Sequence, residues 1–245
     1  MTSWTTTAPS AYTDVAQAPI WCSFKGVLCG TDSAGLDYRR VKTIILSFYR
    51  LEGYLTPLSS LTEMRTFYIS DNLIFGDILR SYFNMQSLSY LYLNNNQLTG
   101  LIPPITSVNS RLAELRLSDN GLEGRIPEGF GMMRALTLLD LGQNALEGTI
   151  PSILNRLSNL GSLYLDSNLL TVTIPVLNQN SLQHVILIIN YLTMGSLKEV
   201  PVTTFSPSAR TYLHTNCLVF RHPRKPFQNV DATHCRSKSP YNCFH

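Results

Sequence analysis

The feature that most constrains this 245-residue chain is a repeat with a period of 22 to 24 residues. The pattern L-x-x-L-x-L-x-x-N-x-L begins at Val41, Met64, Leu88, Leu112, Leu136, Leu160 and Leu182. Chance does not hold one register over about 150 residues. The sequence therefore predicts a stack of similar coils, each of which contacts only its neighbours.

Each repeat combines one short strand with a bend. The L-x-L core has a period of two, so its leucines face one side, and stacked coils can bury that side. An asparagine follows the strand, and its carboxamide has the donors and the acceptor to satisfy buried backbone groups of adjacent coils. We therefore interpret these leucines and asparagines as scaffold. The asparagines are Asn72, Asn96, Asn120, Asn144, Asn168 and Asn190, and the first copy has Tyr49 instead.

The best copies continue into the motif x-G-x-I-P. It occurs at Thr99–Pro103, Glu123–Pro127 and Glu147–Pro151. With this extension the chain closely resembles the plant-type extracellular leucine-rich repeat family. The resemblance implies an α/β repeat: a right-handed solenoid, or horseshoe, with a parallel concave β-sheet, about seven 24-residue repeats and cysteine-stapled caps. The motif is imperfect elsewhere, since Thr56 and Leu79 replace the proline and Val172 replaces a glycine.

The five cysteines lie near the two ends of the chain. This distribution suits staples on the solenoid ends and an oxidising compartment, whereas free thiols of a cytosolic protein are the alternative. The segment Ile20–Cys29 resembles the family's N-terminal cap, C-x-W-x-G-V-x-C, which implies a disulfide between Cys22 and Cys29. The end of the chain similarly looks like a cap closed by Cys217 and Cys235, which leaves Cys243 over.

We divide the chain into an N-terminal cap (1–40), seven repeats (41–205) and a C-terminal cap with a tail (206–245). Residues 1–20 have neither the basic start nor the apolar stretch of a secretory signal. In the family a longer helix precedes the cap cysteines, so we infer that this cap is truncated. The expected location remains extracellular or at the cell surface.

The concave face is where repeat proteins of this shape generally bind partners. Neighbouring strands lie about 4.8 Å apart, so outward side chains of successive coils should form one patch. Tyrosine and arginine dominate binding hot spots, although tyrosine ladders also simply suit strands. We predict that a protein or peptide ligand contacts Tyr68, Tyr90, Tyr92, Glu114, Arg116, Asp140 and Tyr164. A co-receptor is a further candidate partner.

Other classes of function have little support in the sequence. A net charge of +3 requires no nucleic acid, and no apolar run approaches the roughly 20 residues of a membrane-spanning helix. The motifs of serine hydrolases, zinc proteases and phosphate-binding loops are absent. Histidines and cysteines crowd the tail, but without the spacing of a zinc site. We therefore predict no catalytic residues, no metal and no cofactor.

The predicted function is a non-catalytic extracellular recognition module, a receptor-like ectodomain or a fragment of one. Two alternatives stay open at this point. The first is a secreted inhibitor of a cell-wall-degrading enzyme, because plant-type solenoids include polygalacturonase inhibitors. The second is a cytosolic leucine-rich repeat scaffold with reduced cysteines.

Overall fold

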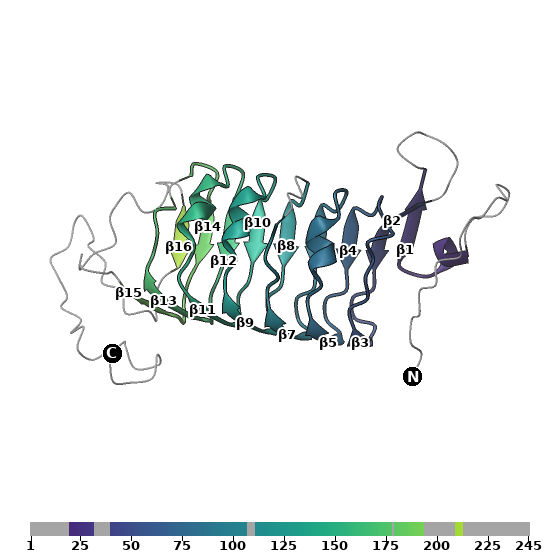
Figure 1. Ribbon diagram of the computed structural model, residues 1–245, viewed down its shortest axis with the longest axis horizontal. Helices are drawn as coiled ribbons and strands as arrows, with labels where there is room; N and C mark the ends of the chain where they lie inside the picture. Colours follow the sequence, from purple (N-terminus) through teal and green to yellow (C-terminus); the bar gives the residue numbers. More distant parts are fainter. Residues whose placement is uncertain (1–19, 32–39, 107–110, 178, 194–208, 213–245) are drawn as a thin grey trace.

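The structure, a computed structural model, describes residues 20–31, 40–106, 111–177, 179–193 and 209–212. These residues form an elongated stack of coils that runs from the N-terminal cap at one end to β16 at the other (Figure 1). Each regular coil adds one strand to each of two sheets. The predicted leucine-rich repeat solenoid is confirmed.

Among the described residues, the concave sheet consists of the strands of the seven repeats, with one strand of the N-terminal cap before them and one further strand after them. In spatial order its nine strands are β1 (Val27–Gly30), β2 (Arg40–Ile45), β4 (Thr66–Tyr68), β6 (Tyr90–Tyr92), β8 (Glu114–Arg116), β10 (Leu138–Asp140), β12 (Ser162–Tyr164), β14 (His184–Ile186) and β16 (Arg210–Tyr212). Strand β1 is antiparallel to β2, and the others pair in parallel. The sheet thus extends by one strand into 206–245, the range predicted to be the C-terminal cap.

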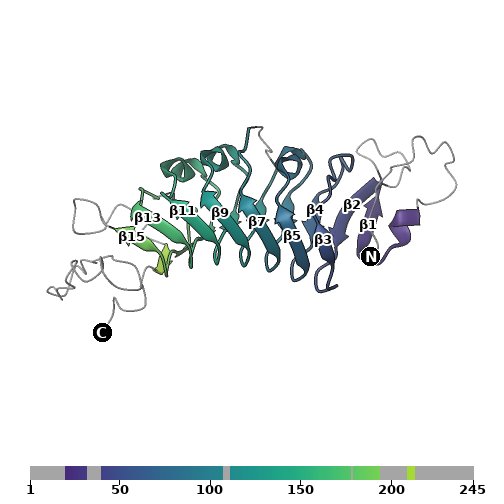
Figure 2. The ribbon, with the colours of Figure 1, turned by 60° about the horizontal axis from the view of Figure 1, so that its bottom comes forward.

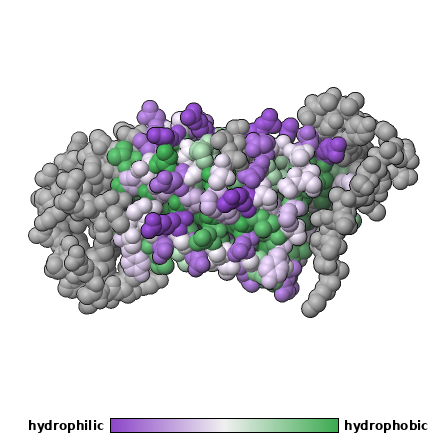
Figure 3. All heavy atoms as spheres, in the orientation of Figure 1, coloured by the Kyte–Doolittle hydropathy of each residue, from purple (hydrophilic) through white to green (hydrophobic). Residues whose placement is uncertain are grey.

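A second, seven-stranded sheet lies beside the first and comes forward in Figure 2. Its strands are β3 (Glu52–Tyr54), β5 (Leu73–Asp77), β7 (Gln97–Leu101), β9 (Gly121–Arg125), β11 (Ala145–Gly148), β13 (Leu169–Thr173) and β15 (Tyr191–Thr193). The helical segments of the described residues are short 3-10 helices, η1 (Ile20–Ser23), η2 (Arg80–Asn84), η3 (Glu128–Met132) and η4 (Ser152–Arg156). On the side seen in Figure 3, polar and apolar residues are interspersed.

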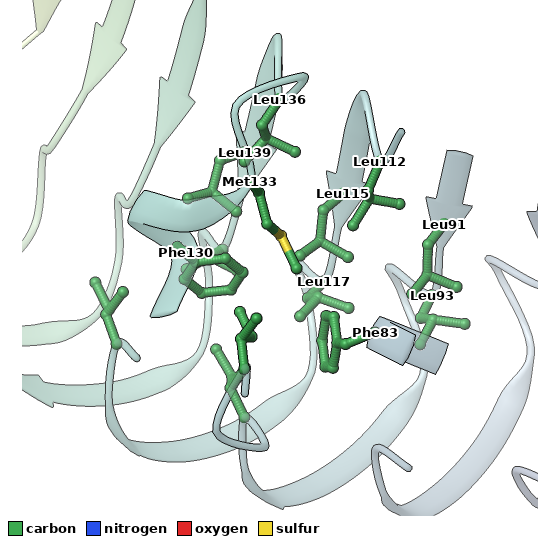
Figure 4. Close-up of a cluster of buried hydrophobic side chains, with 14 of the residues drawn as sticks. Phe83, Leu91, Leu93, Leu112, Leu115, Leu117, Phe130, Met133, Leu136 and Leu139 are labelled. Carbon is green, nitrogen blue, oxygen red and sulfur yellow. The ribbon is translucent and has the colours of Figure 1, made fainter. Parts of the chain in front are cut away.

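The core is a continuous column of side chains between the sheets and the 3-10 helices. The inward leucines of the strands, such as Leu91, Leu115 and Leu139, have no exposed surface. Phe83 of η2 and Phe130 of η3 fill the side opposite these strands, and their ring centroids are 6.5 Å apart (Figure 4). Each coil therefore buries its apolar side only by stacking on the next.

The predicted asparagine ladder is confirmed. The side-chain amide of Asn120 donates to the carbonyls of Leu93, Leu117 and Ser118 at 3.0 to 3.1 Å. Its side-chain oxygen accepts the N–H of Leu98, in the preceding coil, at 2.9 Å. The same pattern recurs at Asn96, Asn144, Asn168 and Asn190.

The first coil lacks this asparagine, and the second coil compensates for it. Where the ladder would begin stands Tyr49, which is 43% exposed. The side-chain oxygen of Asn72 accepts two backbone N–H groups of the first coil, those of Tyr49 and Leu51, at 3.1 and 2.9 Å. The Asn72 carboxamide thus provides hydrogen-bond partners for backbone groups at the bend of the first coil as well as at the bend of its own coil.

The bend before each ladder position needs a left-handed backbone. The residues in this place have φ between 52° and 64°: Phe48, Asp71, Asn95, Asp119, Gln143, Ser167 and Ile189. Asparagine and aspartate tolerate this conformation, whereas a bulky residue is strained in it. The strained residues are therefore Phe48, in the first of these coils, and Ile189, in the last.

The N-terminal cap contains the expected disulfide between Cys22 and Cys29, whose Cα atoms are 5.7 Å apart. The cap joins the first coil where Gly26 accepts a hydrogen bond from the N–H of Ile45 at 2.7 Å. Gly26 has φ 89°, and a Cβ there would collide with the carbonyl of Ile45, so this junction requires glycine. The expected Cys217–Cys235 pair and Cys243 lie outside the described residues.

Asn120→Ala should destabilise the solenoid without changing its surface. The substitution leaves the N–H of Leu98 without its partner and removes one of the hydrogen bonds to each of the Leu93, Leu117 and Ser118 carbonyls, which costs on the order of 2 kcal/mol. Urea unfolding followed by circular dichroism measures the loss. Asn94→Ala, on the concave side and outside the ladder, is the control and should cost much less. Equal stability of the Asn120→Ala variant and the natural chain would contradict the ladder.

Phe48→Asn should stabilise the protein. Phe48 is 78% exposed, so its replacement loses little burial, and asparagine relieves the strain of the left-handed backbone. We expect the free energy of unfolding to rise by about 1 kcal/mol. The matched control is Leu28→Asn, which removes a 58% exposed side chain from a strand and should give no gain. A Phe48→Asn variant no more stable than the natural chain would refute the strain argument.

Candidate functional site

The predicted binding residues lie on the outward side of the concave sheet, as the register required. Pairing brings Tyr68 beside Tyr92, and Tyr92 beside Arg116, on successive strands. Arg116 is followed in the same row by Asp140 and then by Tyr164. In the neighbouring row Tyr90 is paired with Glu114. All seven predicted residues therefore lie on one face, in two adjacent rows.

At the centre of this face three side chains form a stack. The rings of Tyr68 and Tyr92 are parallel to within 13°, and their centroids are 4.1 Å apart. The guanidinium carbon of Arg116 lies 4.9 Å from the centroid of the Tyr92 ring, in a cation–π geometry. We call Tyr68, Tyr92 and Arg116 the aromatic stack. It spans three consecutive coils and is partly exposed along its length.

Glu114 ties the stack together from the neighbouring row. The Tyr92 hydroxyl donates a hydrogen bond to the Glu114 carboxylate, and an Arg116 Nη2 lies 3.6 Å from the same oxygen. Burial and this hydrogen bond raise the pKa of the Tyr92 hydroxyl, which therefore stays protonated at neutral pH. Burial lowers the pKa of Arg116, but Tyr92, Glu114 and Asp140 outweigh it and raise that pKa overall. The ring stacking, the hydrogen bond and the ion pair thus hold Tyr92 and Arg116 against each other and against Glu114.

Beyond the stack, toward the C-terminal coils, the face becomes acidic. Asp140 is oriented by two hydrogen bonds, from the Ser118 hydroxyl at 2.9 Å and from the Gly142 N–H at 3.2 Å. Burial nevertheless raises the pKa of Asp140, and the charge of Asp166 adds to this effect. Burial also raises the pKa of Asp166, with a further contribution from Asp119. These carboxylates are therefore near enough to repel one another.

Two of the predicted residues stand apart from these contacts. Tyr90 is 37% exposed beside the stack, and Tyr164 lies next to Asp140 in register; neither is in a ring stack among the described residues. Ser118 and Asp119 also lie on this face, although they are not among the residues predicted from the sequence. Both follow strand β8, at the seventh and eighth positions of their repeat. The same register, carried two or three residues past each strand, would have found them.

The chemistry that this face offers is that of recognition: aromatic rings, one guanidinium and several carboxylates on a rigid sheet. Within the described part of the chain, no group of three or more histidine, cysteine, aspartate or glutamate side chains could hold a metal ion. Within the same residues, no helix has the length and apolar character needed to cross a membrane.

Comparisons with known proteins agree with the fold and the motif. A leucine rich repeat family model matches residues 110–170, and a second one matches residues 87–108. Phytosulfokine receptor 1 from Arabidopsis thaliana is 32% identical over 102 residues, which cover 41% of this chain and 10% of that receptor.

Solved structures of plant receptors are also similar. The plant peptide hormone receptor RGFR1, in complex with RGF2, is 29% identical with a TM-score of 0.60, over 66% of this chain and 30% of that chain. A second similar structure is the ectodomain of the receptor kinase GASSHO1/SCHENGEN3 from Arabidopsis thaliana, in complex with CASPARIAN STRIP INTEGRITY FACTOR 2. It is 27% identical with a TM-score of 0.59, and the match covers 81% of this chain and 32% of that chain. This chain therefore spans about a third or less of these relatives.

The repeat motif and the solenoid with its two sheets agree with these similarities. The chain is a leucine-rich repeat protein that is similar, over these repeats, to the ectodomains of plant receptors.

Proposed function

We propose that this chain is a non-catalytic extracellular recognition module, a receptor-like ectodomain or part of one, that binds a peptide or an extended protein segment on its concave face. The observation that carries the proposal is the aromatic stack. Tyr68, Tyr92 and Arg116 present two rings and a guanidinium in one fixed arrangement, on the outward side of the sheet.

The stack has the properties of a binding hot spot. Its side chains point away from the core, so the solenoid does not need them for its own burial. Stacking and the hydrogen bond to Glu114 hold Tyr92 in place, so a ligand would pay little entropy for ordering it. Tyrosine and arginine are also the residues that most often dominate binding energy.

The class of ligand and the location follow from the relatives. Two similar structures are complexes, of a peptide hormone receptor with RGF2 and of a receptor kinase ectodomain with CASPARIAN STRIP INTEGRITY FACTOR 2. By this likeness we assign the present chain a peptide ligand and an extracellular location. The Cys22–Cys29 disulfide favours an oxidising compartment and weighs against a cytosolic scaffold. The enzyme-inhibitor alternative stays a prediction that nothing here favours.

A random library of 12-residue peptides displayed on phage tests the proposed function. The library is selected on the immobilised chain, and the selected peptides are then assayed on a Tyr92→Ala/Arg116→Ala variant. If each residue contributes about 1 kcal/mol or more, binding should weaken at least about 30-fold. Thermal unfolding should change little, because neither side chain is in the core.

The matched control removes the same two residue types from the other sheet. Tyr54 of β3 is 71% exposed, and Arg125 of β9 is exposed. A Tyr54→Ala/Arg125→Ala variant should bind the selected peptides like the natural chain. If the peptides bind the Tyr92→Ala/Arg116→Ala variant equally well, the concave face is not the site and the proposed function is wrong.

A further inference from the structure

The charge of the concave face differs from that of the whole chain. The chain as a whole is cationic, with a formal charge of +3. We count the charged residues at the third, fifth, seventh and eighth positions of the seven repeats. The only guanidinium at these positions is that of Arg116. The carboxylates are five: those of Asp71, Glu114, Asp119, Asp140 and Asp166. The face proposed to bind the ligand is therefore anionic on a chain that is not.

The single guanidinium forms no ion pair with the carboxylates beyond it, although its charge lowers the pKa of Asp140 and so opposes the effect of burial. Arg116 lies over the ring of Tyr92, and its ion pair is with Glu114, on its own strand. Neither Asp140 nor Asp166 forms an ion pair with another of the described residues. The next cation at these positions, Arg210, is on β16, two strands beyond β12.

The surroundings of Asp140 and Asp166 position these two carboxylates. Ser118 and Gly142 orient Asp140 through hydrogen bonds. Gly142 also leaves room for Asp166, since a Cβ on this glycine would lie only 2.8 Å from a carboxylate oxygen of Asp166. Their raised pKa values agree with partial desolvation and mutual repulsion, which a cation placed between them would relieve.

We propose that the ligand of the concave face is a cationic peptide, which places an aromatic or aliphatic side chain on the aromatic stack and a lysine or arginine at Asp140 and Asp166. This inference rests on the proposed function and names the chemistry of its ligand. Its basis is charge complementarity along a sheet face that is continuous with the stack.

The geometry also gives the spacing of the two groups on the peptide. Strand β6, with Tyr92, is three strands from β12, which precedes Asp166. At about 4.8 Å per strand this is about 14 Å, and an extended peptide advances about 3.3 Å per residue. The apolar and basic residues of the ligand are therefore about four positions apart.

The phage library that tests the proposed function also tests this inference, with a different readout. Peptides that lose binding on the Tyr92→Ala/Arg116→Ala variant are sequenced. We expect an excess of lysine and arginine over aspartate and glutamate relative to the unselected library, with a basic residue three to five positions from an aromatic or aliphatic one. Binding should weaken with added salt and with falling pH, because both reduce the attraction of the carboxylates.

Neutral variants then locate the charge effect. For the most enriched peptide, made synthetically, Asp140→Asn/Asp166→Asn should weaken binding at least tenfold, and Asp166→Asn alone should weaken it in part. The control, Glu123→Gln/Glu147→Gln, removes two exposed carboxylates from the other sheet and should have little effect. Circular dichroism confirms that each variant is folded, and Asp166→Asn serves if the double variant is not.

The two proposals fail in different ways. Stack-dependent peptides that are neutral or acidic, or that bind the Asp166→Asn and double variants like the natural chain, overturn the cationic ligand but leave the concave face as the binding site. Peptides that all ignore the stack overturn the proposed function and, with it, this inference.

Discussion

The solenoid depends on one side-chain interaction, the hydrogen bonding of the ladder asparagines. Where each strand ends, backbone N–H and C=O groups of two coils turn into an interior that water does not reach, and such groups are costly without partners. A single carboxamide satisfies up to five of them at Asn72. Hydrophobic stacking alone is non-directional, so the ladder and the strand pairing of the two sheets together fix how far each coil advances.

A fixed advance is also what makes the concave face a usable surface. Because every coil repeats the same register, the side chain at a given position always lies beside its equivalents in the two neighbouring coils. Tyr68, Tyr92 and Arg116 stack for this reason, although 24 residues separate each from the next. The core leucines and ladder asparagines place fewer demands on the outward positions, where strand propensity and, at the eighth position, the left-handed backbone are the remaining constraints of folding.

Much of the fold could be predicted because its physical cause is local and repeated. The L-x-L strands and the ladder at Asn120 follow from residues at fixed spacing, whereas the Cys22–Cys29 disulfide is implied by the resemblance of this segment to the family's N-terminal cap. The rows of the concave face could be predicted for the same reason. The register could not show that Arg116 turns toward Tyr92 and Glu114 rather than Asp140, because that choice depends on rotamers and desolvation. Nor could it show the left-handed backbone at Phe48, where the sequence has no asparagine or glycine to signal it.

The orientation of Arg116 decides the character of the whole face. Had its guanidinium turned to Asp140, the cation would have neutralised the carboxylates, and the stack would have ended at Tyr92. Turned as it is, Arg116 extends the aromatic row by one coil and forms its ion pair with Glu114, so its charge acts on Asp140 without a direct pair and Asp166 has no ion pair among the described residues. Opposite charges attract each other more strongly where water is partly excluded. The contact of Arg116 with Tyr92 and Glu114 therefore both extends the aromatic stack and leaves Asp140 and Asp166 without an ion pair in the described part of the chain, which is the basis for proposing a cationic ligand.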